Sequence, residues 1–427
     1  YVRDAKTGQV LFKKDINRYF EPASNQKLFT AFAALQYLGP DFKYRTQLFV
    51  DTKKIHKENL NANLYLQFSG DPTLTLQQLD QLISTLTQVG IQRIKGKVIV
   101  NDTAFDQMVM SPGTAWDDQD YCWGAPVSAL IINHNCVTAT LKPAQPGKPA
   151  LLELPDYPQT MQFDNQVTTR EKDAKDCVSK VKRSDQKTYT ITGCIREDAA
   201  PKPIEMAISS PRENTRALLA YLLKKNGIKV RGKIEFANFE NTSTPFAAQD
   251  SAPLKVIISK MLKESDNMIA DVLFKTMGST YAHESGSFTN GNLAVRHIIE
   301  KTIQLNFPKT TLIDGAGISR YNYLTPEQIV ILLQKIFLSP QAKEFMSSLA
   351  IAGVDGTLKD RMKEPLTRGK VYAKTGSETA VISLSGYIKT KQKQTLIFSI
   401  MINGFTNSAS KYIRLEDKIC RVIAEAG

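Results

Sequence analysis

The residues best suited to do chemistry in this sequence are a serine and a lysine three positions apart, Ser24 and Lys27. Positions three apart on a helix share one face, so the lysine amine can reach the serine hydroxyl. Lysine serves as a general base only where burial and a cationic neighbour lower its pKa towards neutrality. The free N–H groups and partial positive charge of a helix N-terminus stabilise an alkoxide and a tetrahedral oxyanion. The pair therefore predicts acyl transfer through a covalent serine ester.

The S-x-x-K spacing also occurs at 179–182, 184–187 and 408–411, and its surroundings distinguish the first copy from the others. Two of these copies lie in a polar, cysteine-rich stretch with no buried helix after them, and the third lies near the end of the chain. Ser24, in contrast, precedes apolar residues at the three-and-four spacing of a buried helix that stops at Gly39. The alternative for Ser24 is an ordinary N-cap.

A second motif, Ser265-Asp266-Asn267, is the only S-x-N in the chain. It lies where a predicted helix at 254–262 breaks before another at 267–277. Such a turn can present a hydroxyl and an amide together, although turn and N-cap chemistry alone would also explain these residues.

A third motif, Lys374-Thr375-Gly376, ends an alternating strand just before Ser377. Glycine lets a ligand approach the strand closely, while lysine and threonine supply a charge and a hydroxyl for a carboxylate. A second K-T-G at 6–8 lies in the opening hairpin turn and precedes Ser24, so the order of the motifs distinguishes the two copies.

The elements that would position these motifs lie at the two ends of the chain. An opening hairpin spans residues 1–12, and from about residue 46 short alternating strands and a helix at 76–89 indicate an inserted module. Further helices are predicted at 293–304, 326–337 and 408–424, and further strands at 370–375, 381–388 and 395–403. These elements predict a discontinuous domain with a hairpin-built antiparallel sheet covered by helices.

The cysteines have no C-x-x-C spacing, and two disulfides with one leftover thiol fit them best. Cys177 and Cys194 bracket a segment that alternates like a strand, and Cys122 and Cys136 flank a short loop, which leaves Cys420 over. If both pairs are oxidised, the protein works outside the reducing cytosol. The chain begins without Met or a signal peptide, so we expect it to be a processed product.

Composition excludes several classes of protein. The net charge is +13, from 55 Lys and Arg against 42 Asp and Glu, but the cations are scattered and no nucleic-acid partner is expected. No apolar run is long enough to span a bilayer, so at most a peripheral membrane association is expected. The four His form no H-E-x-x-H, and G-x-G-x-x-G, Walker A and G-x-S-x-G motifs are absent. We therefore expect neither a metal nor a cofactor.

The three motifs, in this order, are the set found in class A β-lactamases and penicillin-binding proteins. The sequence resembles the class C low-molecular-mass penicillin-binding proteins, the D-alanyl-D-alanine carboxypeptidase/endopeptidases of the penicillin-binding protein 4 type. The resemblance extends to PASNQK at 22–27, LGPDF at 38–42, GDPTL at 70–74, Ala125-Pro126 ahead of Asn135-Cys136, KESDNMIAD at 263–271 and DGAGISR at 314–320. The separation of 265 − 24 = 241 residues between the two motif serines disfavours a simple β-lactamase.

The resemblance implies a mixed α/β (α+β) fold. It implies a β-lactamase/transpeptidase-like domain, with an antiparallel sheet flanked by helices, interrupted by two inserted mainly-β domains. The expected borders are 1–45 plus 249–427 for the catalytic domain, 46–138 plus 203–248 for the first insertion and 139–202 for the second.

The resemblance also implies catalytic roles, carried over residue by residue. Ser24 would be the acylated nucleophile and Lys27 its general base. Ser265 would relay the proton to the leaving group, and Asn267 would hold the substrate peptide. Lys374 would bind the terminal carboxylate of the substrate.

Further residues would bind the substrate. Thr375 would assist Lys374, and the backbone N–H groups of Ser24 and Ser377, beside Gly376, would form the oxyanion hole. Asp118, or its neighbour Asp117, would bind the free amine of the cross-linking diamino acid, and Arg320 would bind the carboxylate of that side chain. Relatives usually carry an apolar residue where this chain has Glu378, so side-chain preference can differ here.

The resulting prediction is a periplasmic or extracytoplasmic serine DD-peptidase that acts on peptidoglycan stem peptides and cross-bridges and is acylated by β-lactams. The alternatives are an enzyme that hydrolyses β-lactams and a catalytically silent cell-wall-binding protein. The sequence does not indicate the oligomeric state.

Overall fold

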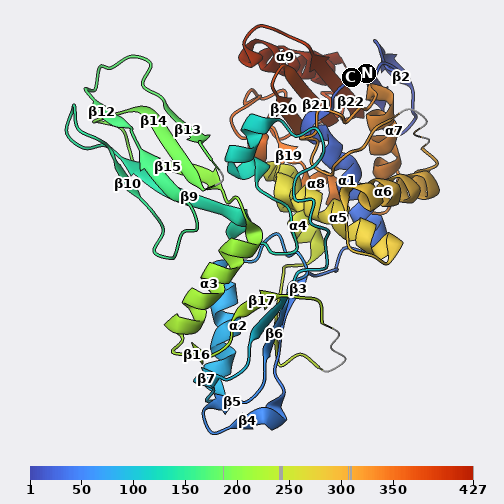
Figure 1. Cartoon of the computed structure of the whole chain (residues 1–427). Helices are drawn as coiled ribbons and strands as arrows, with labels where there is room; N and C mark the ends of the chain where they lie inside the picture. Colours follow the sequence, from blue (N-terminus) through green and yellow to red (C-terminus); the bar gives the residue numbers. More distant parts are fainter. Residues whose placement is uncertain (186, 240–243, 306, 308–309, 427) are drawn as a thin grey trace. The chain divides into compact units, whose positions relative to one another are not determined.

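The computed structural model describes residues 1–185, 187–239, 244–305, 307 and 310–426. The chain forms two compact units (Figure 1). The first comprises Tyr1–Lys43, Ser111–Ala115 and Ala252–Gly427, and the second comprises Tyr44–Met110 and Trp116–Ser251. The further division of the middle of the chain into two inserted domains stays a prediction.

The first unit is built on an antiparallel sheet with the strand order β19-β20-β21-β22-β1-β2. Its strands are β1 (Val2–Asp4), β2 (Val10–Phe12), β19 (Ala350–Ile351), β20 (Val371–Glu378), β21 (Val381–Lys389) and β22 (Thr395–Asn403). Val2 pairs with Phe398, so the opening hairpin joins the C-terminal strands in one sheet. The predicted antiparallel sheet is thus confirmed, and it unites segments almost 400 positions apart.

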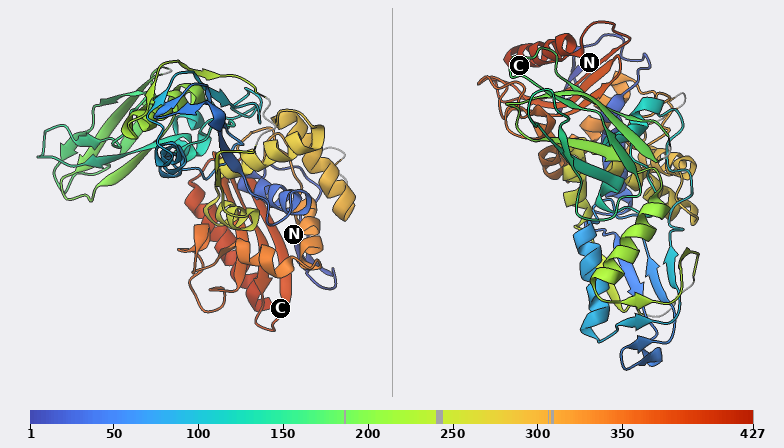
Figure 2. Two further views of the ribbon diagram at one scale, coloured as in Figure 1. Left: turned by 90° about the horizontal axis from the view of Figure 1, so that it is seen from below. Right: turned by 60° about the vertical axis from the view of Figure 1, so that its left-hand side comes forward.

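Helices cover both faces of this sheet. They are α1 (Lys27–Tyr37), α4 (Leu254–Glu264), α5 (Asn267–Ala282), α6 (Phe288–Ile303), α7 (Pro326–Phe337), α8 (Ala342–Ser348) and α9 (Ala409–Ala426). One face packs Val371, Ala373 and Leu384 against Cys420 and Ile423 of α9. On the other face α1 contacts α4, α5 and α6, which places a buried helix in the middle of the unit (Figures 1 and 2).

Two local expectations need correction. Ser24 lies in a 3-10 turn, η1 (Ala23–Gln26), and the α-helix begins only at Lys27. The helix expected at 293–304 begins at Phe288, because Ser287 and Asn290 form a capping box there.

Among the described residues of the second unit, two α-helices, α2 (Leu76–Gln88) and α3 (Pro211–Lys225), pack on two sheets. One sheet contains β3 (Arg45–Phe49), β6 (Leu64–Gln67), β8 (Val98–Asn101), β17 (Ile234–Phe236) and β18 (Ala247–Asp250). The other contains β4 (Ile55–His56), β5 (Asn59–Leu60), β7 (Arg93–Ile94) and β16 (Lys229–Val230).

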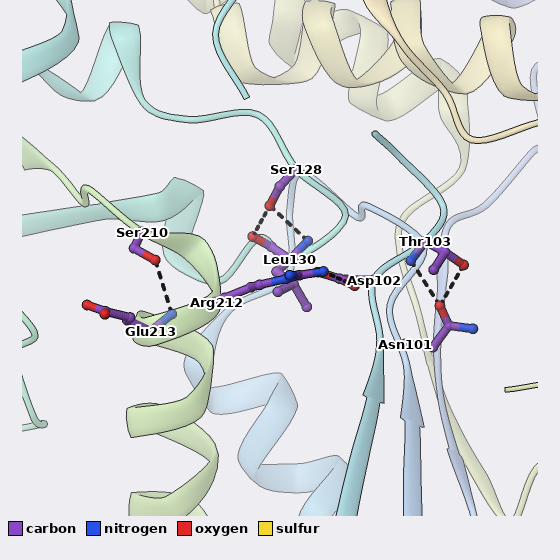
Figure 3. Close-up of polar contacts among 8 residues, drawn as sticks. All are labelled: Asn101, Asp102, Thr103, Ser128, Leu130, Ser210, Arg212 and Glu213. Carbon is purple, nitrogen blue, oxygen red and sulfur yellow. Dashed lines mark hydrogen bonds and ion pairs between the residues drawn. The ribbon is translucent and has the colours of Figure 1, made fainter. Parts of the chain in front are cut away.

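Polar contacts fix the start of α3 against the end of β8 (Figure 3). Arg212 forms two hydrogen bonds with the buried carboxylate of Asp102, at 2.7 and 3.1 Å. Ser210 caps the helix by accepting from the Glu213 N–H. The orientation of α3 is therefore set by an ion pair as well as by its apolar face.

The remaining strands of the second unit surround a separate hydrophobic cluster. They are β9 (Cys136–Lys142), β10 (Leu151–Glu153), β11 (Gln162–Asn165), β12 (Thr168–Arg170), β13 (Ser179–Arg183), β14 (Thr188–Arg196) and β15 (Lys202–Ala207). The 3-10 turns of the second unit are η2 (Thr52–Lys54), η3 (Trp116–Asp120), η4 (Cys122–Gly124) and η5 (Asn133–Asn135), and the first unit also contains η6 (Gly356–Leu358).

The predicted cysteine pairs are present as disulfides. Cys122 pairs with Cys136, and Cys177 pairs with Cys194 across the β13–β14 hairpin. Cys420 is a buried free thiol. Within the described ranges, no helix has both the length and the apolar character that a membrane span requires.

Candidate active site

The serine and lysine of the first motif touch each other where η1 passes into α1. Lys27 Nζ lies 2.8 Å from Ser24 Oγ. The serine is 9% exposed and the lysine 0% exposed, so the hydroxyl is at the surface of the site and the amine is beneath it. The contact expected from the three-residue spacing is present, although it forms across a 3-10 turn.

The turn that carries Ser24 is held in place by β21. Ser383 Oγ donates to the Pro22 carbonyl at 2.7 Å and accepts from the Asn25 side-chain amide. Ala23 has a positive φ of 46°, a conformation that costs an L-residue about 1–2 kcal/mol and persists only where surrounding contacts hold it. Ser24 thus lies on a backbone that its neighbours fix.

Lys27 Nζ has two further partners, and neither of them can donate a proton. It lies 2.6 Å from Asn267 Oδ1 and 2.7 Å from the carbonyl oxygen of Ala316. A neutral amine has two N–H groups and one lone pair. When these two oxygens accept both N–H groups, the lone pair is left to face the Ser24 hydroxyl. This is the geometry that a general base requires.

The electrostatics of Lys27 fit the same role. Burial lowers the pKa of its amine from 10.5 to about 8, although the carboxylates of Asp271, Asp314, Asp266 and Glu378 oppose this by raising it. A substantial fraction of the amine is therefore neutral in mildly alkaline solution.

The second and third motifs meet each other on the same face. Lys374 Nζ donates to Ser265 Oγ and to the Thr375 carbonyl, each at 2.7 Å. Ser265 occupies a left-handed conformation (φ 64°) between α4 and α5, and Asp266 caps α5 by accepting from the Ile269 N–H at 2.9 Å. Burial, together with the charge of Lys27, lowers the pKa of Lys374 well below 10.5.

Strand β20 passes close to Ser24. A Cβ placed on Gly376 would clash with Ser383 Oγ and would lie 3.0 Å from both the Pro22 carbonyl oxygen and the Ser24 nitrogen, so a larger residue would displace the turn that carries Ser24 or the side chain that holds it. Ser377 follows with its side chain exposed. Thr375 Oγ1 lies 2.8 Å from Thr357 Oγ1 of η6, a neighbour that no sequence pattern indicated. The described contacts therefore bring Ser24, Lys27, Ser265, Asn267 and Lys374 together.

Arg320 already has partners within the first unit. Its Nε lies 3.0 Å from Glu21 Oε2, and its Nη2 donates to the Thr379 carbonyl at 2.9 Å. Glu378, the last residue of β20, is half-buried, and its carboxylate raises the pKa of Lys27. A negative charge of β20 therefore acts on Lys27, from the position where an apolar residue was expected.

Asp118 belongs to η3 of the second unit and accepts from Trp123 Nε1 at 3.4 Å. Asp117, its neighbour in the same turn, is exposed. Their predicted contact with the substrate amine stays a prediction.

The other copies of the motifs lie in different settings. Ser179 begins strand β13, Ser408 precedes α9, and the K-T-G at 6–8 forms the turn between β1 and β2. The copy at 184–187 includes residue 186, which lies outside the described residues.

Sequence reasoning missed two buried carboxylates. Asp271 accepts from the N–H groups of Gly315 and Ala316, and Asp314 accepts from those of Gly317 and Ser319. Both lie in segments that carry the family resemblance, KESDNMIAD and DGAGISR. The resemblance therefore pointed to these two residues, but no role was predicted for either.

Comparison with known proteins gives a consistent result over the whole chain. Residues 1–424 match the family described as D-Ala-D-Ala carboxypeptidase 3 (S13). The chain is 30% identical over 408 residues to D-alanyl-D-alanine carboxypeptidase DacB of Haemophilus influenzae, and the matched region covers 95% of this chain and 85% of that protein. It is also 30% identical over 439 residues to D-alanyl-D-alanine carboxypeptidase of Actinomadura sp. strain R39, and this match covers 99% of this chain and 80% of that protein.

Solved structures agree. The crystal structure of penicillin binding protein 4 (dacB) from H. influenzae superposes with a TM-score of 0.88 at 30% identity, covering 99% of this chain and 95% of that one. A structure of the same protein complexed with a novel β-lactam gives a TM-score of 0.83 at 29% identity, with the same coverage.

Proposed function

The chain belongs to the D-Ala-D-Ala carboxypeptidase 3 (S13) family, and from this premise we propose that it is a serine D-alanyl-D-alanine carboxypeptidase with DD-endopeptidase activity on peptidoglycan peptides. The observation that supports this most strongly is the buried Lys27 amine, whose two fixed acceptors direct its lone pair at Ser24.

Acylation begins when Lys27 takes the Ser24 proton and Ser24 Oγ bonds to the carbonyl carbon of the penultimate D-alanine. The backbone N–H groups of Ser24 and Ser377 stabilise the resulting oxyanion. Ser265, hydrogen-bonded to Lys374, passes its hydroxyl proton to the leaving nitrogen as the C–N bond breaks. Ser265 then regains a proton from the protonated Lys27. Terminal D-alanine then leaves with a free amine.

Water completes the cycle by attacking the ester, with Lys27 again as the base, and releases the shortened peptide. A β-lactam follows the first half of this sequence, but its opened ring stays attached to the acyl group and does not diffuse away. Deacylation is then slow, so β-lactams act as covalent inhibitors.

Lys374 and Thr375 bind the terminal carboxylate of the substrate. Because burial lowers the pKa of Lys374, an arriving carboxylate supplies the counter-charge that favours its protonated form. Asn267 holds the peptide backbone. Asp118, with Asp117 as its rival, binds the amine of the diamino acid, and Arg320 binds the carboxylate beside it, for which it must exchange part of its pairing with Glu21.

The protein acts in the periplasm or another extracytoplasmic compartment, at most peripherally bound to the membrane, and its partner is peptidoglycan. Two disulfides support this location, because such bonds persist in oxidising compartments.

Intact-mass measurement with benzylpenicillin tests the proposal. We expect the parent chain to gain one penicilloyl group that persists for many minutes and Ser24→Ala to gain none. An adduct that clears within seconds would instead indicate a β-lactam-hydrolysing enzyme. A parent chain that stays unmodified would indicate a catalytically silent cell-wall-binding protein.

A further inference from the structure

Asp271 lies one helical turn after Asn267 on α5, so the two side chains share one face of the helix. It is 4% exposed. Its Oδ1 accepts hydrogen bonds from the backbone N–H groups of Gly315 and Ala316, each at 2.8 Å. A buried carboxylate that takes two backbone donors on one oxygen fixes the orientation of both peptide planes.

The segment that Asp271 holds is fixed from the α1 side as well. Thr30 Oγ1 donates to the Gly315 carbonyl at 2.8 Å, and Gln26 Nε2 donates to the Asp314 carbonyl at 3.1 Å. A Cβ on Gly315 would clash with the Ala270 carbonyl, so this backbone runs directly against α5. The loop is thus fixed between two helices.

The Ala316 carbonyl is one of the two oxygens that accept from Lys27 Nζ, and Asn267 Oδ1 is the other. Helix α5 supplies one of these acceptors directly, through Asn267. The Ala316 carbonyl belongs to the peptide between Ala316 and Gly317, whose N–H donates to Asp314 Oδ1 at 2.6 Å. Asp271 holds the peptide just before it, through the Ala316 N–H. If this backbone turned, one N–H of the amine would lose its acceptor and the lone pair would no longer point at Ser24.

We propose that Asp271 is a positioning residue for the acylation step, which orients the lone pair of Lys27 towards Ser24 by fixing the peptide that leads into Ala316, the residue whose carbonyl accepts from Lys27. The inference rests on the proposed function, because it concerns how the same base is aligned. The charge of Asp271 also raises the pKa of Lys27, while burial raises the pKa of Asp271 itself well above 3.8.

The test compares Asp271→Ala, which removes the acceptor, with Asp271→Asn, whose amide oxygen can still accept from both N–H groups. Glu416→Ala is the matched control, since Glu416 is another buried carboxyl of the first unit that lies on α9, across the sheet from the site. For each variant, stopped-flow acylation by a fluorescent penicillin over a range of concentrations gives the limiting rate constant and the dissociation constant of the non-covalent complex.

We expect Asp271→Ala to lower the limiting rate constant about 10- to 100-fold, part of the 10²–10⁴ that general base catalysis typically contributes. The dissociation constant should change less than about 3-fold, because Asp271 does not touch the ligand, and Asp271→Asn should recover most of the rate. Glu416→Ala should lower the stability but keep the rate constant. A parent-like rate in Asp271→Ala, or equal losses in the Ala and Asn variants, would overturn the inference while leaving the proposed function intact.

If Asp271→Ala does not fold, Thr30→Val tests the same loop from its other side, because it removes only the hydrogen bond to the Gly315 carbonyl. We then expect a loss of about 3- to 10-fold in the limiting rate constant, again with unchanged binding, because a single hydrogen bond is lost. An unchanged rate would overturn the inference. Absence of any adduct on the parent chain would overturn the proposed function and this inference together.

Discussion

At the scale of single residues, two buried lysines lie close together with different partners. Lys27 contacts a serine hydroxyl and two carbonyl oxygens, whereas Lys374 contacts Ser265 and a backbone carbonyl. Burial lowers the pKa of both amines, and the charge of Lys27 lowers the pKa of Lys374 further because like charges repel. In the proposed reaction, Lys374 binds the substrate carboxylate and Lys27 accepts the proton of Ser24.

The pH dependence of acylation should report Lys27. Its pKa is about 8, and only the neutral amine can take the Ser24 proton. We expect the acylation rate by benzylpenicillin to rise with pH below about 8 and to level off above it. Rates measured from pH 6 to pH 9.5 test this, and a rate independent of pH across that range would contradict it.

Glu378 should shift that profile. Its carboxylate raises the pKa of Lys27, so Glu378→Gln lowers the pKa and moves the rise in rate to lower pH. The same pH series, run on the variant beside the parent, measures the displacement. Coinciding profiles, or a displacement to higher pH, would show that this carboxylate does not act on the base.

At the scale of elements, α9 covers the face of the sheet opposite Ser24 and Lys27, and its Glu416 and Asp417 form a partly buried ion pair with Arg361. Arg361 lies 2.9 Å from Glu416 Oε2 and 2.7 Å from Asp417 Oδ1. The other oxygen of Glu416, Oε1, is buried and has no hydrogen-bond partner among the described residues. Burial raises the pKa of Glu416 from 4.5 to about 7, in spite of the charge of Arg361.

Stability should therefore fall as the pH rises through the pKa of Glu416. The folded state holds the proton of the Glu416 carboxyl more tightly than the unfolded state does. The stabilisation that this proton gives is therefore complete below about pH 4.5 and is lost above about pH 7. At 1.36 kcal/mol per pKa unit, this amounts to roughly 3 kcal/mol. The free energy of unfolding, measured with urea, should be lower at pH 8 than at pH 5 by that order in the parent, and Glu416→Gln should remove this difference. An identical pH dependence of the free energy of unfolding in parent and variant would contradict the raised pKa of Glu416.

At the scale of the whole molecule, the sequence predicted the three motifs, their elements and their meeting, because helical and strand periodicity are local signals. The S-x-x-K, S-x-N and K-T-G segments each lie on or beside the expected element. The acceptor at Ala316 and the pairing of Arg320 with Glu21 could not be predicted in this way. They depend on backbone carbonyls and on contacts between distant segments, and neither produces a periodic pattern in the sequence.

The second unit should tolerate loss of a disulfide without loss of acylation. Closing a loop of 17 residues with Cys177–Cys194 contributes about 3 kcal/mol in the chain-entropy account. We expect the double variant Cys177→Ser/Cys194→Ser to show a lower unfolding midpoint, while its acylation rate stays within about 2-fold of the parent, because Ser24 and its partners all lie in the first unit. A comparable loss of acylation in a folded variant would contradict this independence.

The central claim is that the neutral Lys27 amine makes Ser24 reactive, and the acylation rate of Lys27→Ala tests it most directly. This variant keeps the nucleophile and its backbone but removes the base. With a labelled penicillin at pH 8.5, we expect a rate about 10²- to 10⁴-fold below that of the parent, the usual contribution of a general base. A folded variant that acylates Ser24 within a few-fold of the parent rate would contradict it.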